Sequence, residues 1–265
     1  MEITYSWQES DEIFRGRRRQ ENPNDVSTIF RQETLHVNWK ALDELELNLL
    51  VPRVEIHNEA LGQENVNLEG LGDLSFFLDW GPWRPQRPEG EKESLFALRG
   101  LSFLVGLKFP TGEQNDDVVP GVTPPSLLQL GTGTYDPLVG VQYRGRTGDF
   151  AIFHTTSAQI SGGASEGGLK PGNVLQTSTG VAYEPFDCCT PSLAIEGLFR
   201  DKDVLNGDTI DNTGSSFWFI TPALSVRIAD RLYLDGSVRI PLYRNVDRTQ
   251  MVPGELWTVG VSWSF

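Results

Sequence analysis

The last nine residues of the chain alternate strictly between large apolar side chains and small or polar ones. Trp257, Val259, Val261, Trp263 and Phe265 occupy one set of alternate positions, and Thr, Gly and Ser residues occupy the other. Because successive side chains of a β-strand point to opposite faces, one face of this strand is apolar and the other is small and polar. Such a segment is typical of a barrel strand that turns its apolar face towards membrane lipid.

The same period of two recurs upstream and predicts about twelve strands. The alternating runs fall near residues 3–20, 27–40, 44–57, 70–80, 94–109, 129–146, 149–161, 171–185, 191–201, 214–228, 231–244 and 253–265. We therefore expect an all-β fold, a single antiparallel transmembrane β-barrel that takes up residues 1–265 as one domain. A soluble β-sandwich is the competing interpretation, but its polar face would be more uniformly hydrophilic.

The connections between these runs alternate in length. Short ones hold Asp43-Glu44, Thr147-Gly148-Asp149 and Ala229-Asp230-Arg231, and longer polar ones span 21–26, 58–69, 110–128, 162–170, 204–213 and 245–252. Outer-membrane barrels have short periplasmic turns and long extracellular loops. An even number of strands then places both termini on the periplasmic side, where 81–93 is an exceptional long connection.

The location expected for such a barrel is the bacterial outer membrane, with membrane lipid and lipopolysaccharide as its surroundings. Mean hydropathy is −0.29 and no run approaches the roughly 18 apolar residues of a spanning helix. Because Met1–Ser6 is not a secretory signal, we expect that a signal peptide has been removed. The spacing of Phe265 with Trp263, Val261 and Trp257 has the pattern that the outer-membrane insertion machinery reads in known barrels.

The net charge of −14 argues against a nucleic-acid partner, because phosphates require a basic surface. Much of the acid lies in the predicted loops, where it forms either a solvated surface or a region that favours cations. The adjacent Cys188 and Cys189 lack the spacing of a metal site. Residues 201–208 fail the calcium-loop pattern because Leu205 occupies a ligand position. No metal and no cofactor is expected.

Three short motifs lie at strand ends in a fixed order: Gly70–Leu74, Leu107–Gly112 and Leu130–Asp136. Together they resemble the "MetA-pathway of phenol degradation" family of outer-membrane transporters, over roughly residues 35–265. The resemblance implies passage of small, often hydrophobic or aromatic compounds through the outer membrane. From the residues themselves, Asp73 and Asp136 should point inward towards a cation such as Lys108 or Arg144, and they either brace the wall or form a charged constriction.

Charged residues at inward positions are the candidate lining of the lumen. They form either a pore surface or a network that stiffens the barrel. These candidates are Asp73, Asp79, Lys108, Asp136, Arg144, Glu184, Glu196, Arg200, Arg227, Asp235 and Arg239.

The connection 110–128 is a candidate gate. It begins with Glu113, Asp116 and Asp117 and continues as an apolar, proline-rich segment. Because proline restricts the backbone, such a segment suits a stiff flap that folds into or over the mouth of the barrel. A surface loop packed against its neighbours is the other interpretation.

Passive passage of small solutes through the barrel is the function that we expect, and two alternatives stay open. The barrel is a sheath or anchor for a periplasmic or redox partner, with Trp83, Arg84 and Arg87 as the docking element. It is otherwise a lipid-modifying enzyme that uses His154, which falls on the lipid face near Thr156. A serine hydrolase needs a nucleophile beside its histidine and an acid or amide to orient it. Because these are lacking, we do not expect an enzyme.

Overall fold

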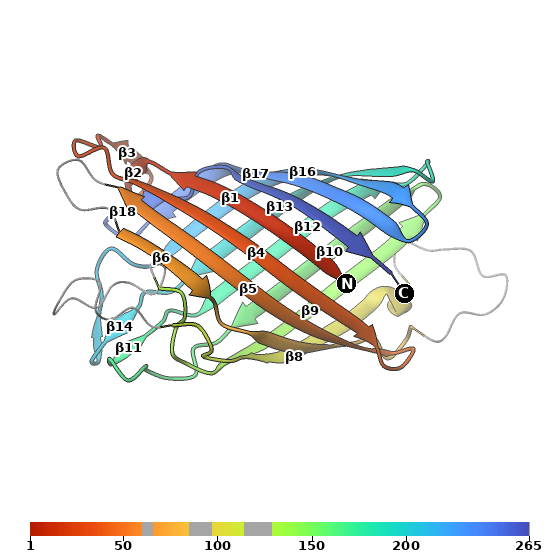
Figure 1. Cartoon of the computed structure of the whole chain (residues 1–265), viewed down its shortest axis with the longest axis horizontal. Helices are drawn as coiled ribbons and strands as arrows, with labels where there is room; N and C mark the ends of the chain where they lie inside the picture. The colour runs from red at the N-terminus through yellow and green to blue at the C-terminus, as the bar shows by residue number, and fades with distance from the viewer. Residues whose placement is uncertain (60–65, 85–96, 114–128, 265) are drawn as a thin grey trace.

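The computed structural model describes residues 1–59, 66–84, 97–113 and 129–264, and within them it is a closed antiparallel barrel of 12 strands (Figure 1). One of the 12 is interrupted and is formed by β6 (Val66–Leu71) and β7 (Ser75–Trp80). The others are β1 (Glu2–Ser10), β4 (Ser27–Lys40), β5 (Leu45–Glu59), β8 (Leu101–Lys108), β9 (Asp136–Thr147), β10 (Phe150–Gln159), β12 (Val174–Tyr183), β13 (Cys189–Arg200), β16 (Ser215–Ala229), β17 (Leu232–Val246) and β19 (Leu256–Trp263).

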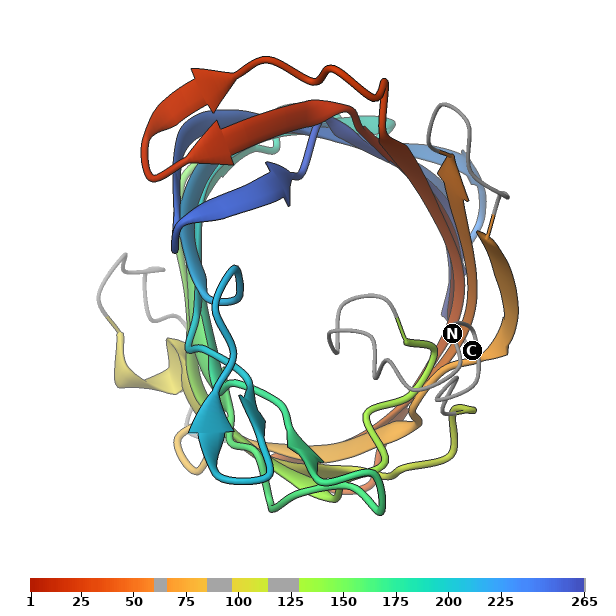
Figure 2. The same cartoon turned by 90° about the vertical axis from the view of Figure 1, so that its left-hand side faces the viewer.

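The ring closes where the first and last strands pair. β1 lies between β19 and β4, with Trp7 opposite Trp257, and the pairing of β4 with β5 completes the circle. Figure 2, seen from the end with the long connections, shows the strands as a ring. Both termini lie towards the other end, where the amino group of Met1 donates to the carbonyl oxygen of Trp263 at 2.9 Å. The predicted fold class is thereby confirmed.

Smaller elements extend the end with the long connections. β2 (Glu12–Arg15), β3 (Arg18–Gln20) and β18 (Thr249–Val252) form one three-stranded sheet, and β11 (Leu169–Lys170), β14 (Val204–Leu205) and β15 (Asp208–Thr209) form another. Within the described ranges the only helical element is the 3-10 turn η1 (Leu98–Gly100). No helix among the described residues has the length and apolarity needed to cross a membrane.

Several predicted strands prove to be shorter or interrupted. The run 3–20 is divided into three strands. β1 belongs to the barrel sheet, whereas β2 and β3 belong to a separate sheet, in which the two-residue turn at Gly16, with φ of 60°, folds β3 back onto β2. The run 70–80 is broken at 72–74, and the run 129–146 becomes a strand only at Asp136. In the described part of the run 94–109, the strand begins at Leu101. The break at 72–74 and the late start at Asp136 lie in two of the glycine-rich motifs, whose backbone turns away from the ladder.

The outer wall carries the apolar side chains that the alternation predicted. Val259 and Val261 of β19 are 56% and 42% exposed, as expected for a lipid-facing surface. Large rings mark both edges of this band. Trp39, Trp80, Phe150, Tyr183 and Trp263 lie near the short-turn end, and Phe199, Trp218 and Trp257 lie towards the other.

Candidate functional site

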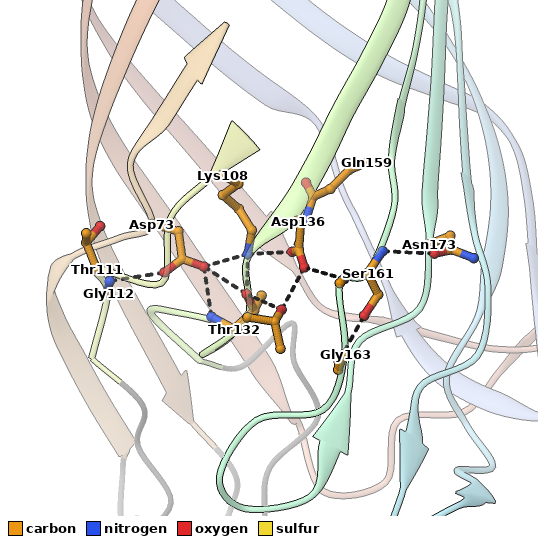
Figure 3. Close-up of polar contacts among 12 residues, drawn as sticks. Asp73, Lys108, Thr111, Gly112, Thr132, Asp136, Gln159, Ser161, Gly163 and Asn173 are labelled. Atoms are coloured by element: carbon orange, nitrogen blue, oxygen red, sulfur yellow. Dashed lines mark hydrogen bonds and ion pairs between the residues drawn. The ribbon is translucent and has the colours of Figure 1, made fainter. Parts of the chain in front are cut away.

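The three glycine-rich motifs meet at one place on the inner wall (Figure 3). Lys108, the last residue of β8, places its Nζ 2.6 Å from Oδ2 of Asp73 and 2.7 Å from Oδ2 of Asp136. It also donates to the hydroxyl of Thr132. We call these four residues the clasp. The prediction that the two aspartates point towards Lys108 agrees with this geometry.

Each carboxylate of the clasp holds a turn of backbone in place. Asp73 accepts from the backbone N–H of Gly112 at 3.0 Å and from that of Thr132 at 2.9 Å. Asp136 accepts from the hydroxyl of Thr134 at 2.7 Å, from Nε2 of Gln159 at 2.9 Å and from the N–H of Gly162 at 3.1 Å. These donors stabilise two carboxylates beside a single ammonium group.

The glycines of the motifs are required by close contact of backbones. A Cβ on Gly131 would collide with the carbonyl oxygen of Gly112, and a Cβ on Gly72 would lie 3.1 Å from Pro52. Glycine is the residue that permits such an approach. The motif order noted in the sequence therefore has a structural cause, since all three motifs build one junction.

The clasp is buried. The side chains of Asp73, Lys108 and Asp136 are 6%, 8% and 0% exposed. A group shielded to this degree does not present its charge to water in the lumen. Of the two interpretations left open, bracing of the wall is the one that this geometry favours for these three residues.

The inner wall forms an open cavity of about 430 Å³ towards the end with the short turns. Small and polar side chains dominate its wall, together with isolated charges. Its lining includes Glu2, Thr4, Arg144, Phe153, Glu184, Ser192, Asp235, Ser237 and Thr258. The mixture matches the predicted character of a lumen face.

Most charges of the lumen pair with neighbours on the inner wall. Arg144 contacts Glu184 at 2.8 Å, and Arg239 contacts Glu196 at 2.6 Å. Asp235 accepts from the hydroxyl of Ser262 at 2.9 Å. These contacts fix the orientation of the polar side chains that line the cavity.

A second, smaller pocket of about 150 Å³ adjoins one of these pairs. Phe219 and Leu198 supply its apolar side, and Glu196 and Arg239 supply its charges. The guanidinium of Arg239 lies 5.4 Å from the centroid of the Phe219 ring, within the range of a cation–π contact. Phe219 was not among the residues predicted to line the lumen. Its signal was the run Phe217-Trp218-Phe219, in which the two phenylalanines share the face opposite Trp218.

The remaining predicted site residues lie apart from this cavity. Asp79 pairs with Arg84 at 2.7 Å, near the short-turn end. Arg200 contacts Asp203 at 3.3 Å at the opposite rim, and Arg227 is exposed where β16 approaches the short turns. Glu113 is exposed. Asp116 and Asp117, the other gate candidates, lie outside the described residues, as does Phe265.

The proposed docking element contacts the barrel itself. Besides Asp79, Arg84 reaches Oε1 of Glu46 at 3.2 Å, and the ring of Trp83 lies 6.3 Å from that of Phe103. Arg87 lies outside the described residues. Two of the three residues expected to serve a periplasmic partner are thus engaged within this chain.

His154 lies on the outer wall, as expected. Its Nδ1 lies 2.7 Å from the hydroxyl of Thr179 and its Nε2 lies 3.0 Å from that of Thr156. The sulfur atoms of Cys188 and Cys189 are 3.7 Å apart and unbonded. No group of three or more His, Cys, Asp or Glu side chains within the described ranges is arranged to hold a metal ion.

No family model matches the chain, and no curated protein matches it. Its fold, however, matches that of the COG4313 outer membrane channel from Pseudomonas putida F1, with a TM-score of 0.72 over 100% of this chain and 95% of that one, at 12% identity. The chain has the closed 12-stranded β-barrel fold of that channel. The barrel also matches the β domain of a Bordetella autotransporter, with a TM-score of 0.54 over 100% of this chain and 99% of that one, at 11% identity.

The match agrees with the resemblance drawn from the motifs. The COG4313 channel is a protein of the MetA-pathway group. At 12% identity the comparison supports a common fold, and it gives no residue-by-residue role to this chain. The matched structure is that of a channel.

Proposed function

We propose that this outer-membrane barrel is a passive channel for small solutes that carry an apolar or aromatic part. The polarity of its inner wall supports this assignment. Towards the end with the long connections, two apolar clusters face inward: Phe217, Phe219, Val246 and Val252 form one, and Val54, Ile56 and Leu130 form the other. Further along the barrel lies the polar cavity.

The pocket at Phe219 is the observation that carries the proposal. Phe219 is 2% exposed, and the pair of Arg239 and Glu196 lies beside it. A ring that enters this pocket would lie against its apolar wall of Leu198 and Phe219, while an anionic or hydroxyl substituent would meet the guanidinium of Arg239. Sites that combine an apolar wall with a few placed polar groups bind small organic molecules.

A path through the lumen follows from the same wall. A solute leaving the Phe219 pocket would meet Arg144, Glu184 and Asp235 in the larger cavity. In this proposal these charged residues line the route, together with Glu196 and Arg239. Asp73, Lys108 and Asp136 instead hold the wall in shape.

The proposal is tested by a pair of anions that differ only in the ring. Proteoliposomes are loaded with benzenesulfonate or methanesulfonate, which cross lipid poorly, and efflux through the barrel is measured. We expect benzenesulfonate to leave faster, and we expect Phe219→Ala to reduce that preference by roughly two- to tenfold, the range for a lost aromatic contact.

Phe150→Ala is the matched control, because this ring lies on the outer wall against Tyr183 with centroids 4.8 Å apart. It should leave the preference unchanged. Liposomes that retain both anions although the barrel is folded would contradict a channel and favour the sheath alternative. Equal effects of the two substitutions would remove the Phe219 pocket from the proposal.

A further inference from the structure

Four arginines lie within five residues at the tip of the β2–β3 hairpin, in a chain whose net charge is −14. The sequence there is Arg15-Gly16-Arg17-Arg18-Arg19, and Gly16 with Arg17 forms the turn. All four arginines are exposed. The acidic chain therefore carries a concentrated basic site at the end with the long connections.

This hairpin is anchored to the barrel rim. The N–H of Gly16 donates to the carbonyl oxygen of Arg248 at 3.0 Å, and the N–H of Val246 donates to that of Gly16 at 3.1 Å. Phe14 packs against the inward cluster that contains Phe217. Because backbone and side chain both hold the hairpin, the arginines are presented in a fixed position.

Arg17 is held on the outer, lipid-facing side of the barrel. Its guanidinium lies 5.2 Å from the centroid of the Tyr243 ring. Tyr243 pairs with Trp218, and paired residues project from the same face of a sheet. Trp218 is one of the outer-wall rings near this edge of the apolar band, a position typical of the water–lipid boundary. Arg17 thus lies at the height of lipid headgroups.

Three of the four arginines have no carboxylate partner among the described residues. Arg19 contacts Glu12 at 3.0 Å, whereas no ion pair within the described part of the chain includes Arg15, Arg17 or Arg18. Arg15 and Arg18 also face each other across the two strands. Like charges directly opposite each other destabilise a strand pair, so this arrangement calls for an anion from outside the chain.

We propose that Arg15, Arg17 and Arg18 bind the phosphate groups of lipopolysaccharide in the outer leaflet. Guanidinium groups bind phosphate through paired hydrogen bonds and remain charged at every physiological pH. The outer leaflet offers phosphates at the height of Arg17, beside the exposed Leu242, which is suited to contact an acyl chain. The site binds a lipid-anchored phosphate, and it is independent of any solute in the lumen.

The test measures binding of the purified barrel to phosphatidylcholine vesicles that contain deep-rough lipopolysaccharide, with or without its phosphates. We expect the wild-type barrel to bind the phosphorylated form roughly tenfold or more tightly, given three cationic contacts at a membrane surface. The variant R15Q/R17Q/R18Q should lose this difference. R248Q is the control, because Arg248 lies at the same rim but pairs with Asp211 at 2.8 Å.

Heat-modifiable migration on gels first establishes that each variant is folded. The wild-type barrel can be compared on the two kinds of lipopolysaccharide without any variant. Equal affinity of the wild type for both lipids would overturn the proposal. The proposal would also be overturned if the triple variant kept the full preference for phosphorylated lipopolysaccharide, or if R248Q lost this preference to the same extent. If inorganic phosphate displaced the barrel from phosphorylated lipopolysaccharide when the two were present at equal phosphate concentration, the ligand would be a soluble anion. This result would also overturn the proposal.

Discussion

At the scale of single residues, the clasp shows how two carboxylates and one ammonium group are kept inside a barrel wall. Lys108 lies between Asp73 and Asp136, and each carboxylate also accepts hydrogen bonds from neighbouring backbone or side-chain donors. A buried ion pair gains little over an apolar replacement, but removal of one partner leaves charge without compensation. Lys108 is therefore the residue on which the junction depends.

Lys108→Met should lower the free energy of unfolding by about 3–5 kcal/mol, because it leaves two buried carboxylates without their cation. Urea unfolding of the barrel in lipid vesicles measures this change. Lys40→Met removes the exposed pair with Asp43 in a short turn and should have little effect. Equal stability of the two variants would show that the clasp is replaceable.

The three charged members of the clasp were predicted from the sequence, but Thr132 and the burial of the group were not. Inward positions of Asp73, Lys108 and Asp136 follow from strand periodicity alone. Their exclusion from water depends on 109–113 and 129–135, which cover the wall because Gly112 and Gly131 approach each other closely. Such contacts join segments far apart in sequence and leave no local pattern.

At the scale of the element, β19 was the most predictable part of the chain. Its alternation places Val259 and Val261 between the rings of Trp257 and Trp263, and the structure agrees. The β2–β3 hairpin was predicted poorly. Residues 3–20 read as one strand, and only the positive φ of Gly16 reveals the turn.

Val259→Arg should destabilise the barrel by about 2–4 kcal/mol, the cost of a basic residue on the lipid face near the bilayer centre. Ser237→Arg, on the lumen face of the neighbouring strand, should keep most of the stability and narrow the cavity instead. Unfolding of both variants in lipid vesicles distinguishes the two faces. A larger loss for Ser237→Arg would reverse the assigned orientation of β17 and β19.

Deletion of Phe265 should reduce insertion into the outer membrane while synthesis continues. The reason is the spacing of this residue with Trp263, Val261 and Trp257, which places aromatic and apolar groups on one face of the last strand. The measurement is the fraction of heat-modifiable barrel in outer-membrane preparations. An unchanged fraction would contradict a role in assembly, and deletion of Met1 provides a terminal control.

At the scale of the whole molecule, the number and order of strands followed from the sequence, whereas the contents of the lumen did not. Twelve alternating runs with short and long connections specify an up-and-down ring. The Phe219 pocket could not be foreseen, because it needs β13, β16 and β17 brought side by side. The pairing of neighbouring strands determines the barrel, but the shape and polarity of its lumen depend on side chains from several strands.

The rings on the outer wall should place their indoles near the lipid headgroups. In vesicles of brominated lipid, tryptophan fluorescence should be quenched more strongly by bromines near the headgroup than by bromines near the chain ends. Trp257→Phe should reduce the headgroup quenching, since Trp257 is 50% exposed on the outer wall. Uniform quenching at both depths would contradict two separate belts.

The partly buried apolar side chains that pack against the two inward clusters, Phe14, Leu198, Phe30 and Leu68, also affect the water inside the barrel. Water wets an apolar wall poorly, and hydrophobic constrictions in channels interrupt conduction by drying. Passage through such a section then costs a hydrated ion the free energy of desolvation, a cost that is absent for an uncharged ring. The barrel should therefore have a low ionic conductance even while it transports organic solute. A small ionic current would then not mean that the channel is closed.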